Sequence, residues 1–411
     1  MGPLVQGSPF HFGWMILLAG TFGSFMTLPG QTAGVSVFID PIIAELDISR
    51  TTVSVAYTTG TLAGVLPAPI IGRWIDRRGP RIAATIIVAG LAAACLYMAV
   101  VQSASMLFLG FALLRGAAIG GLSLVSQHIV NLWFVHRRGI AAAAGSIGLA
   151  TGSMAFPPIF NWLIGNYGWR AAYVSVAALI TVTMLPVAMS LFRDRPEKYG
   201  MTVDAGLPAI IKATAEEPSF TRAEALRTGA FWLLCAIGFL TNAVGTALLL
   251  NHFSIMGAMN VDRSQAVSVL IAYATVQAAL TLGTGAMLDR YEPRRLVPFA
   301  MILLALTSSL PIAGQGTLVG WVYAMCLGAA YGSQQAISAA GFARYFGRDH
   351  LGAIRGASFV FGISGAAFGP LPFAFSVELT GSYFAALVAS LALALACATA
   401  SFYVSAPKLA A

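Results

Sequence analysis

The basic residue Arg115 stands inside a long apolar run, and it has the clearest potential for chemistry in the chain. It lies about ten residues from one end of that run, so at about 1.5 Å per residue it sits about 15 Å deep, near the middle of a bilayer. A lone charge at that depth is costly and is by default a functional residue. Because no Asp or Glu lies deep in any apolar run, Arg115 must face carbonyls, water or an anionic ligand. Bracing of helices, contact with a substrate, and both together stay open.

Uncharged polar side chains in the apolar runs are the second set of candidates. Ser24, Thr27 and Gln31 fall on one face at helical spacing, and Tyr331 and Gln335 are one helical turn apart. Such groups often hydrogen-bond between packed helices, but they also suit recognition of a small solute. The candidate substrate-binding residues are Gln31, Arg115, Asn242, Tyr331 and Gln335.

One histidine is a candidate for proton coupling. His252 follows Asn251 near the end of an apolar run, and histidine is the side chain that ordinarily titrates near neutral pH. The alternative is an interfacial histidine hydrogen-bonded to the backbone.

The chain offers nothing that resembles an enzyme site. We find no nucleophile–base pair, no metal-ligand set and no phosphate-binding loop, so we expect no enzyme activity, no cofactor and no metal. The four cysteines fall inside apolar runs without metal-ligand spacing, and we interpret them as small core hydrophobes: Cys95, Cys235, Cys326 and Cys397.

The composition explains where these residues must lie. Of the 411 residues, 58% are hydrophobic and 9% are charged, against about 25% charged in a soluble domain. The chain holds roughly a dozen runs of the length that crosses a membrane. The net charge of +8 does not indicate nucleic-acid binding, because the basic residues are scattered through short loops. The composition therefore predicts an all-α membrane protein.

Twelve membrane-spanning helices are predicted, in two six-helix halves. The N-terminal half is residues 1–192, a cytoplasmic linker follows at 193–228, and the C-terminal half is 229–411. Pro218 and Ser219 are start signals for a short amphipathic helix in the linker. The predicted spans are 14–37, 50–71, 81–102, 105–134, 139–164, 169–192, 229–255, 263–288, 296–313, 316–342, 351–376 and 382–405.

Basic residues set the expected orientation. Of the 23 Lys and Arg residues, all but Arg50, Arg115, Arg170 and Arg263 fall on the side that holds both termini and the linker. Such loops face the cytoplasm. We therefore expect both termini inside, in a plasma membrane, that is, the inner membrane of a bacterium.

Internal repeats relate the two halves. The stretch Gly72–Arg81 and the stretch Gly285–Arg295 share a frame of Gly, three residues and Asp-Arg, and they lie about half the chain apart. Gly116–Gly120 likewise matches Gly328–Gly332. Equal numbers of spans in the halves predict repeats related by an axis along the membrane normal.

Glycines recur at matching places in spans five and eleven. They are Gly145, Gly148 and Gly152, and Gly362, Gly365 and Gly369. Small residues let helices approach closely, and Pro-Gly pairs let them bend. Packing and gating both stay open.

These motifs resemble the major facilitator superfamily. The likeness rests on the two Asp-Arg loops, the twelve spans, and Arg115–Gly120 in span four. It implies that spans one, four, seven and ten line a central cavity. It also implies that the Asp-Arg loops latch helices together in one conformation, with Gly72, Asp76, Arg77, Arg81, Asp289 and Arg290 as the latch residues.

A narrower resemblance is to the monocarboxylate transporters and their oxalate/formate-antiporter relatives. It rests on Thr221–Thr228 followed by Phe231–Leu234, on Arg137–Ala141, and on Gly168-Trp169-Arg170. Many members carry a basic residue in span one and an Arg in span eight. Here span one has Gln31 and span eight reads Tyr273–Leu280 without Arg, so neither role is carried over.

The sequence thus predicts a secondary transporter of a small organic solute working by alternating access. A monocarboxylate-like anion with proton symport is the family-based expectation, and a monomer in the bilayer is the expected form. The alternative is an exporter of neutral or anionic small molecules. A sensor or scaffold is disfavoured, because little chain is left over for a soluble signalling domain.

Overall fold

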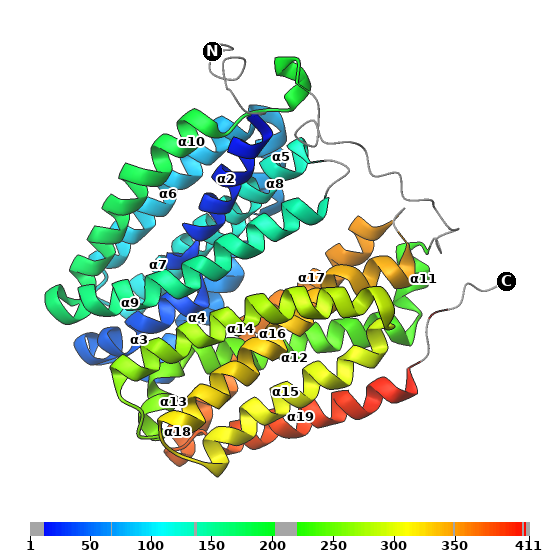
Figure 1. Cartoon of the computed structure of the whole chain (residues 1–411). Helices are drawn as coiled ribbons and strands as arrows, with labels where there is room; N and C mark the ends of the chain where they lie inside the picture. Colours follow the sequence, from blue (N-terminus) through cyan, green and yellow to red (C-terminus); the bar gives the residue numbers. More distant parts are fainter. Residues whose placement is uncertain are drawn as a thin grey trace. The chain divides into compact units, whose positions relative to one another are not determined.

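The computed structural model describes residues 12–66, 68–134, 138–201, 220–347, 350–404 and 407. Over these residues the chain folds into helices joined by short turns (Figure 1). The predicted all-α class is confirmed. Most of the linker, 202–219, lies outside the described residues, as do the side chains of the predicted latch residues Asp76 and Asp289.

The first six spans are built from segments rather than uniform rods. The first span breaks at Leu28–Gly30, where Pro29 and Gly30 interrupt the helix. The helix after the break continues to Leu46, well beyond the predicted end at residue 37. The elements are α2 (Phe12–Phe25), η1 (Leu28–Gly30), α3 (Thr32–Leu46), α4 (Arg50–Val65), α5 (Ala68–Arg78), α6 (Pro80–Ala99), α7 (Ala104–Arg115), η2 (Gly116–Ser123), α8 (Leu124–Trp133), α9 (Arg138–Leu179), η3 (Ile180–Met184) and α10 (Leu185–Leu191).

The last six spans are more regular. They are preceded by η4 (Pro196–Tyr199) and α11 (Arg222–Leu226). The membrane elements are α12 (Gly229–Leu250), α13 (His252–Ala258), α14 (Arg263–Arg290), α15 (Pro293–Ala313), α16 (Thr317–Phe346), α17 (Leu351–Phe368), α18 (Pro370–Thr380) and α19 (Phe384–Tyr403).

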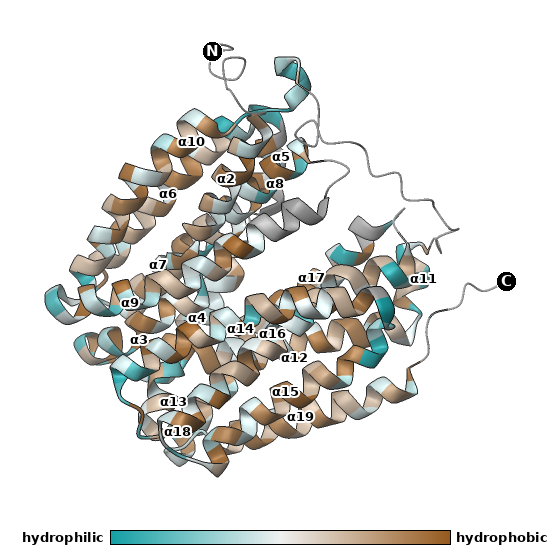
Figure 2. Cartoon of the chain, in the orientation of Figure 1, coloured by the Kyte–Doolittle hydropathy of each residue, from teal (hydrophilic) through white to brown (hydrophobic). Residues whose placement is uncertain are grey.

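Ten stretches among the described residues are long and apolar enough to cross a membrane. One of them, Gly145–Leu191, holds two helices that meet at Gly168, whose φ of 80° suits only glycine without strain. The helix α16 is 30 residues long but carries Tyr331, Gln334 and Gln335, and it is not among the ten. With these two additions the twelve predicted spans are all present. Apolar residues dominate the helices and hydrophilic ones gather at their ends (Figure 2).

The chain forms two compact units: residues 1–48 with 59–212, and residues 49–58 with 213–411. In the first unit α9 packs on α2 and α6, and α10 packs on α6. In the second, α14 packs on α16, α15 on α16 and α19, and α12 on α17. The hydrogen bonds from residues 49–58 to the rest of the second unit include one from Arg50 Nη1 to Asn251 Oδ1 (3.3 Å) and one from Thr58 Oγ1 to the Ala367 carbonyl (2.6 Å).

Two glycines hold α9 against α2 in the first unit. A Cβ atom on Gly148 would lie 2.1 Å from the carbonyl oxygen of Thr21, and one on Gly152 would lie 2.9 Å from that of Phe25. The glycines and the carbonyls are each one helical turn apart, so the two backbones touch along a short seam.

The second unit repeats this seam between α12 and the pair α17–α18. A Cβ atom on Gly365 would lie 2.3 Å from the carbonyl oxygen of Phe239, and one on Gly369 would lie 2.0 Å from that of Ala243. Backbone cannot move aside as a side chain can. Of the two interpretations left by the sequence, the contacts therefore support packing at these glycines.

The linker ends in the short helix α11. The predicted start signals at 218 and 219 lie outside the described residues, and the helix begins at Arg222 with Thr221 as its cap. Thr221 Oγ1 accepts a hydrogen bond from the Glu224 N–H (3.3 Å), and Glu224 Oε2 accepts one from the Thr221 N–H (2.7 Å). This reciprocal pair is a capping box. It satisfies two N–H groups that the start of a helix otherwise leaves without partners.

Candidate functional site

Arg115 is the last residue of α7 and only 3% of it is exposed. Its Nη1 donates to the carbonyl oxygen of Gly30 at 3.3 Å. In an unbroken helix that carbonyl would accept from the N–H of Gly34, but the N–H groups of Gly34 and Val35 both donate to Gln31. Because of the break in the first span, the Gly30 carbonyl does not accept the usual helical hydrogen bond, and it accepts one from the buried Arg115 instead.

The approach between the two spans is close enough to require glycine. A Cβ atom on Gly30 would lie 2.4 Å from Cβ of Ala118 and 2.6 Å from the carbonyl oxygen of Leu114. Directly after Arg115 the backbone widens into the π-helical stretch η2, a local irregularity often found at functional sites. Arg115 therefore braces span four on span one, one of the alternatives that the sequence left open.

Gln31 stands next to this contact and continues it as a polar chain. Its Nε2 donates to Thr27 Oγ1 at 3.4 Å, and Thr27 Oγ1 donates to the Ser24 carbonyl at 2.7 Å. Ser24 and Thr27 are buried, whereas Gln31 is half-buried. The polar face predicted in span one thus ends beside the buried guanidinium.

The predicted residues of the second unit lie on two helices. Asn242 on α12 is half-buried, and its Nδ2 donates to the Gly238 carbonyl at 2.7 Å. Gln335 on α16 is also half-buried, with Oε1 at 3.5 Å from the hydroxyl of Thr281 on α14. The Asn242 side chain also carries Oδ1, an acceptor, and the Gln335 side chain carries Nε2, a donor. Both atom types suit polar contacts with a small solute.

Tyr331 fills the junction of α12, α14 and α16. A Cβ atom on Gly245 would lie 2.0 Å from its ring, and the ring of Tyr273 stands edge-on to it with centroids 6.0 Å apart. Only 9% of Tyr331 is exposed. The ring of Tyr331 therefore packs against α12 at a position where only glycine leaves enough room.

His252 opens α13 and is 1% exposed. Its Nε2 lies 2.9 Å from the Ala266 carbonyl, and since a carbonyl only accepts, Nε2 carries the proton. The ring also stacks near Tyr323, with centroids 6.4 Å apart. This is the backbone-bonded arrangement that the sequence offered as the alternative to a proton site.

The predicted latch residues surround the ends of α5 and α14. A Cβ atom on Gly72 would lie 3.9 Å from Leu124 Cδ2. Arg77 is exposed, and Arg81 is half-exposed at the start of α6. Arg290 is exposed at the end of α14. With the side chains of both aspartates outside the described residues, the latch stays a prediction.

The end of α14 is held by a residue that the sequence did not single out. Arg344 on α16 donates through Nη1 to the carbonyls of Leu288 and Tyr291. A cation at that place is favourable, because the last carbonyls of a helix carry partial negative charge. Beside it Arg294 pairs with Glu292 at 2.6 Å. Only the tertiary fold reveals this contact, since α16 and the loop are far apart in sequence.

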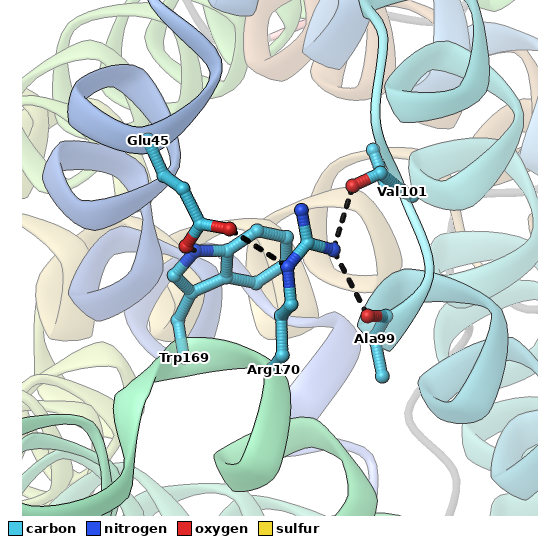
Figure 3. A network of polar contacts seen from close by, with 5 residues as sticks. All are labelled: Glu45, Ala99, Val101, Trp169 and Arg170. Atoms are coloured by element: carbon cyan, nitrogen blue, oxygen red, sulfur yellow. Dashed lines mark hydrogen bonds and ion pairs between the residues drawn. The ribbon is translucent and has the colours of Figure 1, made fainter.

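A second network missed by the sequence lies at the turn between spans five and six (Figure 3). Arg170 Nε pairs with Glu45 Oε1 at 2.8 Å, and its Nη1 donates to the carbonyls of Ala99 (2.9 Å) and Val101 (2.7 Å). Trp169 Nε1 donates to Glu45 Oε2 at 2.5 Å. One guanidinium therefore joins the ends of α3 and α6 to the kink of α9 at Gly168. The motif was visible, but its acidic partner is 125 residues away.

Among the described residues no group of three or more His, Cys, Asp or Glu side chains could hold a metal ion. Cys95, Cys235 and Cys397 are buried and Cys326 is half-buried.

The model of the Major Facilitator Superfamily matches residues 13–370. The curated relatives include monocarboxylate transporter 13 of Rattus norvegicus, 28% identical over 41% of this chain and 39% of the relative. They also include the oxalate:formate antiporter of Oxalobacter formigenes, 24% identical over 53% and 49%. The chain therefore matches half or less of the length of these relatives.

Solved structures share the fold. A bacterial homologue of the human lysosomal transporter Spinster has a TM-score of 0.74 at 15% identity, covering 98% of this chain and 100% of the other. A nucleoside transporter has a TM-score of 0.69 at 13% identity, covering 94% and 99%. At these identities the likeness concerns the fold alone.

Proposed function

The chain belongs to the Major Facilitator Superfamily, and we propose that it moves a small monocarboxylate-like anion by alternating access, coupled to protons. Membership of this family, whose model matches residues 13–370, supports transport of some small solute across a membrane. The choice of an anion is supported by the buried cation in the first unit and by the two curated relatives.

The observation that carries the proposal is the surroundings of Arg115. A backbone carbonyl is a dipole and does not cancel the charge of a guanidinium, so a buried arginine that braces a carbonyl retains its attraction for an anion. The planar fork of N–H donors on an arginine has the geometry that pairs with a carboxylate. In this proposal the neutral donors Gln31, Asn242, Tyr331 and Gln335 add polar contacts that orient the solute.

The test is uptake of radiolabelled monocarboxylates into proteoliposomes that contain the purified full-length protein. Arg115→Gln should raise the half-saturating concentration or lower the rate by about tenfold or more, because a hydrogen bond to a charged group contributes about 1.5–3 kcal/mol. Arg222→Gln, an exposed arginine on α11, is the matched control and should behave as wild type. Uptake only of neutral compounds, unchanged by Arg115→Gln, would instead support the exporter of neutral or anionic compounds and leave Arg115 as a brace.

Proton coupling is assigned to His252 in this proposal. His252 is the candidate because histidine ordinarily titrates near neutral pH, and its contact with the Ala266 carbonyl holds the ring in place. Uptake driven by an inward proton gradient should be lost in His252→Gln, while counterflow at equal pH persists. His350→Gln, an exposed histidine, is the control. Gradient-driven uptake that survives His252→Gln would refute this assignment.

The latch proposal has its own test. Asp76→Asn removes one charge from the last turn of α5 and should abolish transport while the amount of protein in the membrane stays normal. Asp289→Asn makes the same change in the second copy of the motif. Near-normal transport by Asp76→Asn would show that the loop is only an anchor.

A further inference from the structure

A basic cavity of about 470 Å³ lies between the ends of α6 and α10, away from the candidate substrate residues. Its polar wall is formed by the start of one membrane span and the residues just after another. Three arginines contribute, Arg78, Arg81 and Arg193, with Thr85 and Tyr199 as neutral polar groups. The cavity therefore sits where a membrane surface meets the helix ends.

Arg193 is the buried member of this wall, with 5% of its surface exposed. Its hydrogen bonds within the described part of the chain go to two backbone carbonyls, those of Phe192 (3.0 Å) and Met189 (3.5 Å). Burial, and then the nearby charge of Arg81, lower the pKa of Arg193 below its ordinary value. Two cations that repel one another in a partly enclosed space attract an anion between them.

Among the described residues that line the cavity, one is acidic. Asp194 lines the cavity, but its carboxylate is paired with Lys198 at 2.9 Å, and its carbonyl oxygen accepts from Trp133 Nε1 at 2.9 Å. The start of α6 adds partial positive charge, because the first N–H groups of a helix point out of it. Gly79, in the left-handed region with φ of 82°, turns the chain so that α6 begins at this wall.

The other wall of the cavity is apolar and open to the side. Ile82, Ile86 and Met189 are each about half exposed, at 49%, 53% and 47%. In a membrane span such residues face acyl chains rather than water. A free phosphate would use only the arginines, whereas a lipid would fill both walls at once.

We propose that this cavity binds an anionic glycerophospholipid, with its phosphate on Arg81 and Arg193 and its acyl chains along Ile82, Ile86 and Met189. Basic pockets between helices at a membrane surface suit such headgroups. The lipid would join the start of α6 to the end of α10, two elements that pack on one another in the first unit. The site is independent of the transported solute, so it can be tested without knowing the substrate.

The experiment measures thermal stabilisation of the purified full-length protein in a neutral detergent as lipid is added. A ligand that binds the folded state stabilises it in proportion to its occupancy. Phosphatidylglycerol should stabilise the protein at lower concentration than phosphatidylcholine. Inorganic phosphate should require much higher concentrations. Equal responses to the two lipids would overturn the proposal, and equal responses to phosphatidylglycerol and inorganic phosphate would show a free-phosphate site instead.

Substitution of single arginines tests whether the lipid binds at this cavity. Arg193→Gln and Arg81→Gln should each raise the half-saturating concentration of phosphatidylglycerol about fivefold or more, the effect expected for one arginine at an anionic surface. Arg222→Gln is the matched control and should leave it unchanged. Arg81→Gln carries the test if loss of the carbonyl contacts prevents Arg193→Gln from folding. An unchanged response in every variant that folds would overturn the assignment.

Discussion

The turns that join the last two spans of each unit are built alike but held by different chemistry. Each contains a glycine with positive φ, Gly168 at 80° and Gly381 at 69°. In the first unit the residue two positions later is Arg170, which pairs with Glu45. In the second it is Tyr383, an uncharged residue.

Tyr383 reaches a comparable place in its own unit. Its hydroxyl donates to Ser254 Oγ at 2.9 Å and lies 3.4 Å from Asn251 Oδ1, both in the segment that ends the seventh span. Arg170 contacts the segment that ends the first span. The duplication has thus kept the place of the contact and exchanged an ion pair for neutral hydrogen bonds.

A charged residue in the first unit also corresponds to an uncharged one in the second unit deeper in the helices. The repeat that matches Gly116 with Gly328 places Leu327, a buried apolar residue, opposite Arg115 in the alignment of the halves. The glycine seams are common to both units, whereas the buried arginine at this position belongs to the first. Shared features maintain packing, and the features that differ are where the chemistry of transport is expected.

The largest predicted loss of folding stability comes from substitutions in the glycine seams that both units share. Gly148→Ala and Gly369→Ala each place a Cβ atom about 2 Å from a backbone carbonyl, and overpacking of this kind costs about 1–3 kcal/mol of folding stability. Thermal unfolding in detergent should show similar losses for both variants. Gly90→Ala and Gly356→Ala are the controls, since no atom lies within 4 Å of a Cβ there. A loss in one unit alone would show that the seams are not equivalent.

The next effect concerns the ion pair of the first unit. Arg170→Lys keeps the charge but lacks the fork that holds Glu45, Ala99 and Val101 together, so we expect a loss of about 1–2 kcal/mol. That value is reduced because about a third of the arginine side chain is exposed to screening (32%). Arg222→Lys makes the same change at an exposed arginine on α11; it is the control and should melt as wild type does. Equal melting temperatures for wild type and Arg170→Lys would show that this network does not stabilise the fold.

A smaller loss is expected at the equivalent turn. Tyr383→Phe removes only neutral hydrogen bonds, which contribute about 0.5–1.5 kcal/mol. High salt should weaken the contribution of Arg170 but not that of Tyr383, because screening acts on charges. Melting temperatures of both variants at low and high salt measure this difference. A salt-dependent effect of Tyr383→Phe would contradict the comparison.

The sequence predicted what depends on periodicity and composition. Twelve spans, the duplication and the polar face ending at Gln31 follow from local patterns, and the structure contains them. The partners of Arg170 and Arg344 did not follow, because each lies on an element distant in sequence. The same holds for the Arg115–Gly30 contact, since it required knowing which carbonyl the break at Pro29 releases.

The smallest effect concerns α11, a helix that precedes the first span of the second unit. Hydrogen bonds from the N–H and then the hydroxyl of Thr221 lower the pKa of Glu224 below its ordinary value of 4.5. A lowered pKa in the folded state means that the stabilisation is complete above pH 4.5 and is lost as the pH falls through the folded pKa. Hydrogen exchange of residues 221–227, corrected for intrinsic rates, should therefore speed up below pH 4.5.

Glu224→Gln should remove this pH dependence, because its side chain does not titrate. Glu378→Gln on α18 makes the same change away from α11 and should leave the dependence in place. If exchange in α11 is equally pH-dependent in Glu224→Gln, the capping box does not set the stability of this helix. The contacts of Phe220, whose N–H donates to the Phe346 carbonyl at 3.1 Å and whose ring stacks edge-on to Phe346, would then hold the segment instead.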